Sequence, residues 1–384
     1  MTKQIAVIGG GIGGLTTALA LQRKGNSVTV YEAAEKIEPV GAGIGIGNNA
    51  MQIFQMLGVA NKIYHAGTKV SSMNITDAQL KPLSVMKLGE FERKYGVHNV
   101  AIHRADLQQI LAEELGFKHI KLGKKLSKIT SKQNITTLTF EDQSTENADL
   151  VIAADGIKSA VRTQLFPQSK IRDTKQWCWR GVCDGSLSQQ WLGKAMEAWG
   201  KGKRFGFVMV NDKTTYWYAV VNENLVDHTQ PNLTKLYQDF HPEVDAIITK
   251  TSQEKIILNR ITDLKPLSKW HEKNICLLGD AAHATTPNLG QGACQAIEDA
   301  YALAQLYHPE KPVHQLFKEY EQLRMKKAKA IVKSSWLVGK VAHLENNGLV
   351  FLRNIFVRNI PKKLSNRQLK AIFDIDYMKS TQSF

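Results

Sequence analysis

The chain has 384 residues, of which 43% are hydrophobic and 22% charged, and this composition indicates a globular protein of two or three folding units. No apolar run approaches the ~20 residues that cross a bilayer, and the N-terminus leads directly into a strand pattern, so we expect neither a membrane span nor a signal peptide. The four cysteines have no metal-binding spacing, so we predict buried thiols in a reducing, cytoplasmic setting and no metal site: Cys178, Cys183, Cys276 and Cys294.

The formal net charge of +15 is unevenly distributed. Residues 310–384 contain 15 Lys and Arg against 6 Asp and Glu, a net charge of +9. We interpret this region as solvated helix faces; the alternatives are attraction of an anionic ligand or of an acidic membrane surface. Neither zinc-finger spacing nor a basic repeat interleaved with aromatic residues is present, so no nucleic-acid partner is expected.

The N-terminal elements form a complete β-α-β unit. An apolar strand is predicted over 4–9, a helix over 15–24 and a second strand over 27–31. Between the first strand and the helix lies Gly9-x-Gly11-x-x-Gly14, the dinucleotide fingerprint in its required context.

The glycines have distinct roles in such a loop. Gly9 permits the tight turn, Gly11 lets the backbone approach a pyrophosphate, and Gly14 lets helix and strand pack closely. Glu32, at the end of the second strand, can accept hydrogen bonds from an adenosine ribose. This unit alone does not decide whether the bound dinucleotide is FAD or NAD.

The rest of the chain alternates between α/β segments and a segment rich in β-strands. Helices are predicted over 48–56 and 105–115, with a strand over 149–154. The middle of the chain instead predicts short strands rich in aromatic and β-branched residues, over 177–183, 196–199, 204–210 and 214–221. Residues 211–213 predict a hairpin turn. The α/β pattern returns at about 274, and from 313 the pattern is mostly helical.

A second glycine-rich loop follows the predicted strand over 274–278. It runs from Gly279 to Gly292 and precedes a predicted helix over 293–306. Helix N-terminal N–H groups point at an anion, so the loop is typical of a ligand-binding turn. Asp280, at the strand end, could hydrogen-bond a polyol hydroxyl.

Four motifs occur in a diagnostic order: GxGxxG, HRADL from His103, DGIKSAVR from Asp155, and GDAAHATTPNLGQG from Gly279. In this order they resemble the FAD-dependent aromatic hydroxylases, single-component flavoprotein monooxygenases with the p-hydroxybenzoate hydroxylase fold. The resemblance extends from Ile5 to about Arg324 and is greatest to the branch of salicylate, 3-hydroxybenzoate and urate hydroxylases.

The resemblance implies an α/β fold: a Rossmann-like FAD-binding domain with an inserted β-rich substrate domain and C-terminal helices. The implied FAD-binding domain is discontinuous, covering 1–70, 100–175 and 265–310. The substrate domain would comprise 71–99 and 176–264, and the C-terminal helical region 311–384.

The resemblance also implies which residues bind FAD. Those along the pyrophosphate and sugars would be Gly9, Gly11, Gly14, Glu32, Ala33, Arg104 and Asp280. Those at the isoalloxazine would be Pro287, with Gly290, Gln291 and Gly292 offering backbone N–H groups to its pyrimidine edge. Asp155 and Gly156 would serve both FAD and NAD(P)H. His103 and His283 are expected to be structural.

The implied reaction belongs largely to the cofactor. NAD(P)H would reduce the flavin, O₂ would give a C4a-hydroperoxide, and one oxygen atom would pass to a small aromatic or polycyclic substrate. Two alternatives remain: a reductase or halogenase of the same fold, and a non-catalytic flavin-binding protein that associates with membranes through its basic C-terminal region.

Two residues match positions of the urate-hydroxylating branch. Arg204 could pair with an anionic substrate, and Tyr216, which shares a strand face with Tyr218, could hydrogen-bond it or relay a proton. Asn288, however, stands where that branch has an aspartate, and Arg180 lies in a WRG pattern closer to benzoate-type members. These two departures argue against urate as the substrate.

Overall fold

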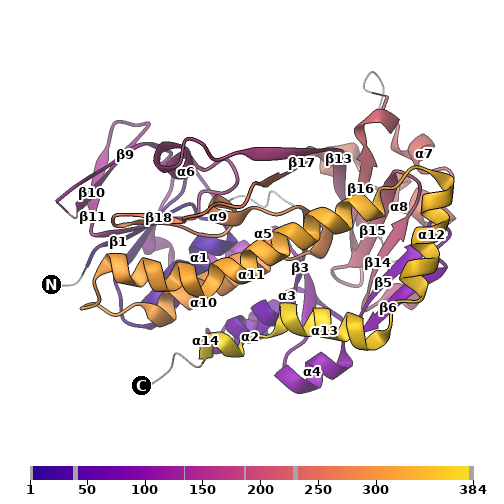
Figure 1. Ribbon diagram of the computed structural model, residues 1–384, viewed down its shortest axis with the longest axis horizontal. Helices are drawn as coiled ribbons and strands as arrows, with labels where there is room; N and C mark the ends of the chain where they lie inside the picture. Colours follow the sequence, from indigo (N-terminus) through magenta and orange to yellow (C-terminus); the bar gives the residue numbers. More distant parts are fainter. Residues whose placement is uncertain (1–2, 38–41, 134, 186, 228–231, 380–384) are drawn as a thin grey trace.

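The computed structural model describes residues 3–37, 42–133, 135–185, 187–227 and 232–379 (Figure 1). Its two largest sheets lie towards opposite ends of the molecule, with the N-terminus at the end of the six-stranded sheet (Figure 1). A long C-terminal helix runs between these two ends.

The six-stranded sheet has the order β18-β19-β12-β1-β2-β8. Its strands are β1 (Ile5–Ile8), β2 (Val28–Tyr31), β8 (Ile120–Lys121), β12 (Leu150–Ala153), β18 (His271–Glu272) and β19 (Ile275–Leu277). All neighbouring pairs are parallel except β18 with β19. The parallel strands therefore end at one edge, where ligands bind in open α/β sheets.

Helices and small sheets complete this half of the molecule. The helices are α1 (Ile12–Arg23), α2 (Asn48–Met56), α3 (Ala60–Ala66), α4 (Gly89–Tyr95), α5 (Arg104–Leu115), α6 (Ala160–Leu165), α9 (Asp280–His283) and α10 (Gly292–Leu306). One three-stranded sheet joins β3 (Gly43–Ile46), β7 (Asn99–His103) and β4 (Thr68–Val70); another joins β11 (Thr145–Ala148), β10 (Ile135–Phe140) and β9 (Leu126–Lys132). Helix α1 packs between α10 and α5, and the apolar β1 lies in the main core.

The seven-stranded sheet has the order β17-β13-β16-β15-β14-β5-β6. Its strands are β5 (Ser72–Asp77), β6 (Pro82–Lys87), β13 (Ile171–Asp184), β14 (Lys194–Trp199), β15 (Lys203–Met209), β16 (Thr214–Asn222) and β17 (Ile257–Leu264). Side chains alternate between its two faces. One face buries Phe205, Phe207 and Trp217 beside α8 (Pro242–Thr249), near the short α7 (Leu233–Leu236). The other carries Arg204 and Tyr218, and we call it the polar face.

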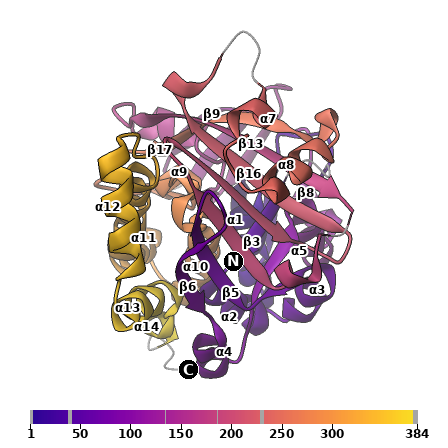
Figure 2. The same cartoon turned by 90° about the vertical axis from the view of Figure 1, so that its right-hand side faces the viewer.

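The first three of the four C-terminal helices that the structure describes pack along the polar face, and the last bonds to α10. The four helices are α11 (Val313–Ala342), α12 (Asn347–Arg358), α13 (Lys362–Phe373) and α14 (Asp376–Lys379). Figure 2 shows them gathered along one side of the molecule, with α12 outermost. Over the described ranges, no helix combines the length and the apolar character that crossing a bilayer requires.

Strand β13 is longer than predicted, because its first half is polar and lacks the alternation that identifies a strand. Residues 171–176 contain three charged side chains and have no strand periodicity, yet β13 pairs with β17 from Ile171 onward. The register shifts between Asp173 and Trp177, where Lys175 has φ 60°. A bulge of this kind bends the strand and allows it to leave one half of the molecule and enter the other. The helix over 48–56 and the hairpin at 211–213 are confirmed.

Candidate flavin and substrate site

The loop between β1 and α1 has one open side. Gly9 has φ 103°, and a Cβ there would lie 2.5 Å from the carbonyl oxygen of Ala154. A Cβ on Gly14 would lie 1.9 Å from the carbonyl oxygen of Gly9, so helix and strand touch at this point. Gly11 differs, because a Cβ there would meet nothing within 4 Å. The open side of Gly11, at the N-terminus of α1, fits an approaching pyrophosphate.

Glu32 is fixed over this loop by backbone donors. Its carboxylate accepts hydrogen bonds from the N–H groups of Gly10, at 2.5 Å, and Ala34, at 2.8 Å. The intervening Ala33 is exposed. Glu32 and Ala33 therefore lie beside the glycine loop, where the adenosine end of a dinucleotide would extend.

Two carboxylates and an arginine line the same sheet edge. Asp155 accepts from the N–H of Val161 at 3.2 Å, while its buried Oδ1 has no hydrogen-bond partner among the described residues. Burial raises the pKa of Asp280, whereas His283 and Arg104 lower it. Because the Asp280 side chain is nevertheless exposed, it lies in a concave part of the surface. An unsatisfied acceptor and a recessed carboxylate are suited to ligand hydroxyl groups.

Arg104 is close enough to Asp280 to lower the pKa of its carboxyl, and Gly156 follows Asp155 at the same sheet edge. Arg104 is exposed at the first position of α5, and its N–H donates to the carbonyl of Ala42 at 3.1 Å. Gly156 has φ 77°, and a Cβ there would meet nothing within 4 Å. The preceding His103 accepts from the N–H of Ala105 at 3.3 Å and caps α5, a structural role.

The second glycine-rich loop ends at the start of α10. A short turn over Pro287–Leu289 places Pro287 at the surface and is closed by Gly290, which has φ 61°. The Gly290 N–H donates to the Pro287 carbonyl at 2.9 Å, so this group closes the turn. The donors left for a ligand are the first N–H groups of α10, from Gln291 and Gly292 onward, which have no carbonyl partner within the helix.

His283 ties this loop to α10. Its Nε2 lies 2.5 Å from Oδ2 of the buried Asp299, which also accepts the N–H of Gly279 at 3.1 Å. Burial opposes ionisation of Asp299, but His283 and Arg324 outweigh it and lower its pKa to about 2. His283 is therefore engaged in holding the loop, as the resemblance implied.

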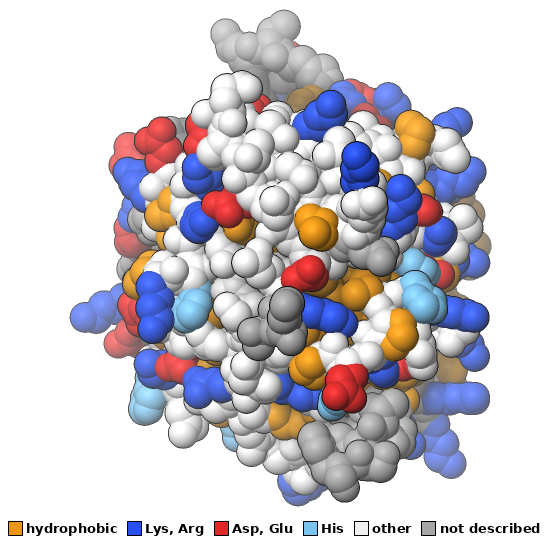
Figure 3. All heavy atoms as spheres, turned by 90° about the vertical axis from the view of Figure 1, so that its left-hand side faces the viewer, with side chains coloured by type: hydrophobic (Ala, Val, Ile, Leu, Met, Phe, Trp, Pro, Cys, Tyr) orange, Lys and Arg blue, Asp and Glu red, His pale blue; other side chains and the backbone are white. Residues whose placement is uncertain are grey.

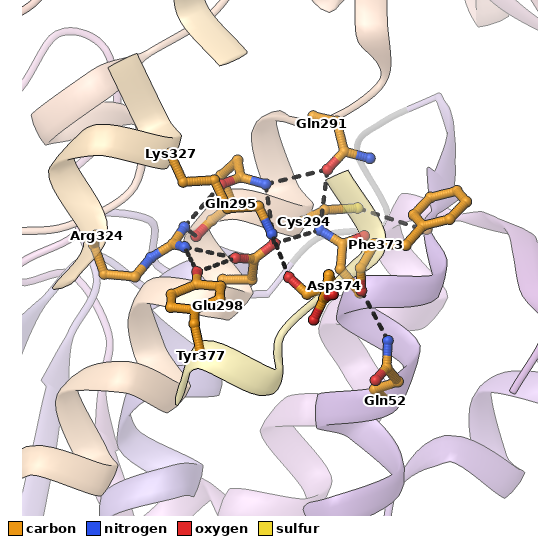
Figure 4. Close-up of polar contacts among 12 residues, drawn as sticks. Gln52, Gln291, Cys294, Gln295, Glu298, Arg324, Lys327, Phe373, Asp374 and Tyr377 are labelled. Atoms are coloured by element: carbon orange, nitrogen blue, oxygen red, sulfur yellow. Dashed lines mark hydrogen bonds and ion pairs between the residues drawn. The ribbon is translucent and has the colours of Figure 1, made fainter. Parts of the chain in front are cut away.

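A buried polar cluster joins the second glycine-rich loop, residues 279–292, which we call the flavin loop, to helix α14 (Figure 4). Glu298 accepts from Asn49 at 2.6 Å and Lys327 at 2.9 Å through one oxygen, and from Arg324 at 2.5 Å and Tyr377 at 2.7 Å through the other. The same Asn49 amide donates to the side chain of the flavin-loop glutamine at 3.0 Å. Sequence reasoning missed this cluster; two adjacent acids in the otherwise uncharged α10 were its only signal.

Arg204 is buried, 1% exposed; both of its Nη atoms are hydrogen-bonded, whereas its Nε has no partner among the described residues. Its Nη1 donates to Glu197 at 3.1 Å, and its Nη2 donates to Oδ1 of Asn288. The Tyr218 hydroxyl donates to the second oxygen of Glu197. Glu197 was missed because its pairing crosses from β14 to β15, although it shares the polar face by register.

Tyr216 lies where the seven-stranded sheet meets β3. Its ring centroid is 6.1 Å from that of Tyr218, and a Cβ on Gly43 would lie 2.4 Å from its ring carbons. Burial raises the pKa of Tyr216, while Arg180 and Arg104 lower it. The polar face therefore contacts both β3 and, through Asn288, the flavin loop.

Comparison with known proteins identifies this arrangement. The sequence model of the family described as FAD binding domain matches residues 2–335. The chain belongs to this family. It is 33% identical to the aurachin C monooxygenase/isomerase of Stigmatella aurantiaca, over 92% of this chain and 93% of that protein. It is 31% identical to the 2-heptyl-3-hydroxy-4(1H)-quinolone synthase of Pseudomonas aeruginosa, over 96% and 97%. The fold matches the Klebsiella pneumoniae protein HpxO with FAD and uric acid, at TM-score 0.87 and 24% identity, over 98% and 97%.

The protein is thus an FAD-dependent monooxygenase with the fold of the aromatic hydroxylases, and the family, the fold class and the cofactor expected from the sequence are confirmed. The reductase, halogenase and non-catalytic alternatives are not favoured. Individual residue roles stay predictions. The open Gly11, the unpaired Asp155 oxygen and the start of α10 fit FAD.

Proposed function

We propose that this monooxygenase uses NAD(P)H and O₂ to hydroxylate an uncharged bicyclic aromatic compound of the 2-alkyl-4(1H)-quinolone type. The observation that carries the proposal is the pairing of Arg204 with Glu197 on the polar face. Among the described residues of the polar face, Arg204 is fully buried and its charge is already balanced by Glu197, while Arg180 on the same face is only partly buried. Such a wall is suited to a neutral ring.

An anionic substrate would have to compete with Glu197. Displacing a carboxylate from a buried arginine leaves an uncompensated charge, which is strongly unfavourable. A quinolone-type ring instead offers a carbonyl and an N–H, which neutral groups such as the Tyr216 hydroxyl can bond. Asn288 is consistent with this arrangement, because its amide donates to Thr286 at 2.9 Å and to the Ser335 carbonyl at 2.8 Å and adds no charge.

The relatives support the same substrate class. Proteins named for aurachin C and for a heptyl quinolone are 33% and 31% identical over 92% and 96% of this chain. A FAD-dependent urate hydroxylase of Klebsiella pneumoniae is 29% identical over 85%. These two sequences therefore match the chain more closely, and over more of its length, than the urate hydroxylase does.

The flavin would supply reduction by NAD(P)H and oxygen activation, and the chain would position both reactants. In this proposal residues 1–70, 100–175 and 265–310 hold FAD, and 71–99 with 176–264 hold the substrate. Tyr216 orients the ring, and the C-terminal helices exclude water from it. Four buried free thiols support a reducing, cytoplasmic location.

A substrate panel tests the proposal. A 2-alkyl-4(1H)-quinolone should stimulate NAD(P)H oxidation and gain one atom from labelled O₂, whereas urate, salicylate and 6-hydroxynicotinate should not. Stimulation by an anionic compound alone would overturn the quinolone assignment without affecting the flavin assignment.

Glu197→Gln sharpens this test. Freeing the charge of Arg204 should lower the KM for salicylate by about ten-fold or more, since a charged hydrogen bond contributes ~1.5–3 kcal/mol, and should raise the KM for the quinolone. Asp239→Asn is the matched control. It removes an exposed acid that pairs, at 2.6 Å, with Lys203, the neighbour of Arg204 on β15. Equal behaviour of the two variants would contradict a neutral pocket set by Glu197.

A further inference from the structure

Helix α12 carries an exposed apolar face, which we call the α12 face. Its residues recur at helical spacing along one side, and each is large and at least 41% exposed: Leu349 50%, Phe351 64%, Leu352 60%, Ile355 41% and Phe356 68%. Isolated exposed hydrophobic residues are ordinary, but five on one three-turn helix form a contiguous patch of the kind that marks an interaction site.

The opposite side of α12 is anchored to the protein. Arg353 donates to the carbonyls of Ala342 at 2.9 Å and Gly200 at 3.2 Å, and its guanidinium lies 5.4 Å from the centroid of the Trp199 ring. Val357 is buried in a small core with Leu83. The orientation of the helix is thus fixed by its inner side, and its apolar side is exposed. Figure 2 shows α12 at the outer edge of the molecule.

The charge around the α12 face has a single sign. Residues 346–373 contain six Lys and Arg and no Asp or Glu. Five of the six are exposed: Arg358, Lys362, Lys363, Arg367 and Lys370. Only Arg358 has a carboxylate within 4.0 Å among the described residues, Asp77 at 3.7 Å. Exposed Phe and Leu beside unpaired Lys and Arg are typical of helices that lie in a membrane interface.

We propose that α12 docks the monooxygenase onto an anionic lipid bilayer, with the α12 face in the headgroup region and the basic residues of α12 and α13 against acidic lipids. A second copy of the chain is a poorer occupant, since pairing two such faces would bring two acid-free basic stretches together. A bilayer with acidic headgroups satisfies both the apolar surface and the positive charge.

The position of α12 gives this docking a use beyond the proposed ring hydroxylation. Trp199, on which Arg353 rests, lies opposite Arg204 in the β14–β15 register and shares the polar face of the sheet. The inner side of α12 therefore contacts the polar face, which is the candidate substrate wall, and the α12 face lies on the outer side of the same helix. A substrate with an alkyl chain partitions into lipid, and the docked enzyme would meet it there.

Vesicle co-sedimentation of the flavin-loaded full chain tests the proposal. The probes are vesicles of phosphatidylcholine alone and of equal parts phosphatidylcholine and phosphatidylglycerol. Wild type should bind the anionic vesicles at least about ten-fold more tightly than the neutral ones. Phe351→Ser with Phe356→Ser should weaken this binding by about ten-fold or more. Phe117→Ser, at a 50% exposed phenylalanine on η1 (Phe117–His119), is the matched control and should bind as wild type does.

Three results would overturn the proposal. The first is no binding to either vesicle type. The second is binding that persists in the double phenylalanine variant and vanishes at high salt, because this would mean screened attraction alone. The third is a wild-type dimer, measured by light scattering, that the double variant dissociates without any vesicle binding, because this would make the α12 face a contact between copies. None of these readouts depends on turnover, so failure here leaves the proposed function intact.

Discussion

At Gly11 and Gly14, addition of one methyl group has opposite expected consequences. Gly14→Ala places a Cβ 1.9 Å from the Gly9 carbonyl oxygen and should destabilise the apoprotein by about 2 kcal/mol or more. Gly11 has φ −73° and open space around it, so Gly11→Ala should leave the apoprotein melting temperature unchanged. It should weaken FAD binding by about ten-fold, or ~1.4 kcal/mol.

Thermal melts of the flavin-free variants and FAD titrations distinguish the two effects. An unaltered FAD affinity in Gly11→Ala would contradict the assignment of this loop to the pyrophosphate.

His343 makes stability depend on pH. Burial, together with the charges of Arg204 and Arg353, lowers its pKa from 6.5 to about 3. The unfolded chain therefore binds one more proton than the native protein between these values, so stability falls as pH drops from about 6.5 towards 3. The slope from this one group is about 1.4 kcal/mol per pH unit. Denaturant unfolding across this range should show His343→Asn losing that slope, while His314→Asn, at an exposed position of α11, retains it.

Single residues differ in how far the sequence could predict them. Gly9 and Gly14 were predictable because their roles depend on backbone geometry within a few residues. The engagement of Arg204 was not, because Glu197 and Asn288 reach it from another strand and another loop. The hydrogen bond by which the Gly290 N–H closes its own turn was also missed. The motif predicts three backbone N–H groups near the flavin, but it does not show which of them is already bonded to a carbonyl within the loop.

At the scale of elements, α14 should support the flavin loop through Tyr377. Tyr377→Phe removes the 2.7 Å hydrogen bond to the buried Glu298 and should cost about 1–3 kcal/mol, since a buried charged acceptor loses a donor. Because Glu298 and Gln291 share the Asn49 amide, FAD affinity should fall as well. FAD titration and chemical unfolding measure the two effects.

Tyr301→Phe is the control for this prediction. Tyr301 lies on α10, like Glu298, but its hydroxyl donates to a weak acceptor, the sulfur of Met56, at 3.2 Å. A loss of stability in Tyr301→Phe as large as that in Tyr377→Phe would contradict a specific role for Glu298.

Elements with a regular period were the predictable part of the fold. Helix α2 occupies the predicted residues, and β15 and β16 flank the predicted turn. The first half of β13 was not predictable, because a polar strand stabilised by partner-strand pairing and by the Arg172–Asp263 ion pair has no alternation of its own. The docking of α13 against Gln52 and Phe91 likewise depends on contacts between residues roughly three hundred positions apart in the sequence.

At the scale of the whole molecule, FAD should stabilise several distant segments of the chain at once. The candidate FAD residues come from segments between Gly9 and Gly292, so one ligand would join chain regions far apart in sequence. At a thousand-fold excess over its Kd, a ligand adds about 4 kcal/mol to the native state. The protein should therefore purify yellow, and removal of the flavin should lower the melting temperature. Identical melting with and without FAD would contradict this.

Helix α11 has a consequence for the rate of turnover. It is bonded to the six-stranded sheet through Glu321 and His271, at 2.9 Å, and to the seven-stranded sheet through the carbonyl of its C-cap residue His343, which accepts from Asn222 at 3.1 Å. Opening the molecule like a hinge between the two sheets would break one of these attachments. Substrate entry and product release should instead proceed by local displacement of α12 and α13. The slow step of the catalytic cycle would then be sensitive to the viscosity and lipid content of the medium, and hydrogen exchange during turnover should increase in these helices rather than in α11.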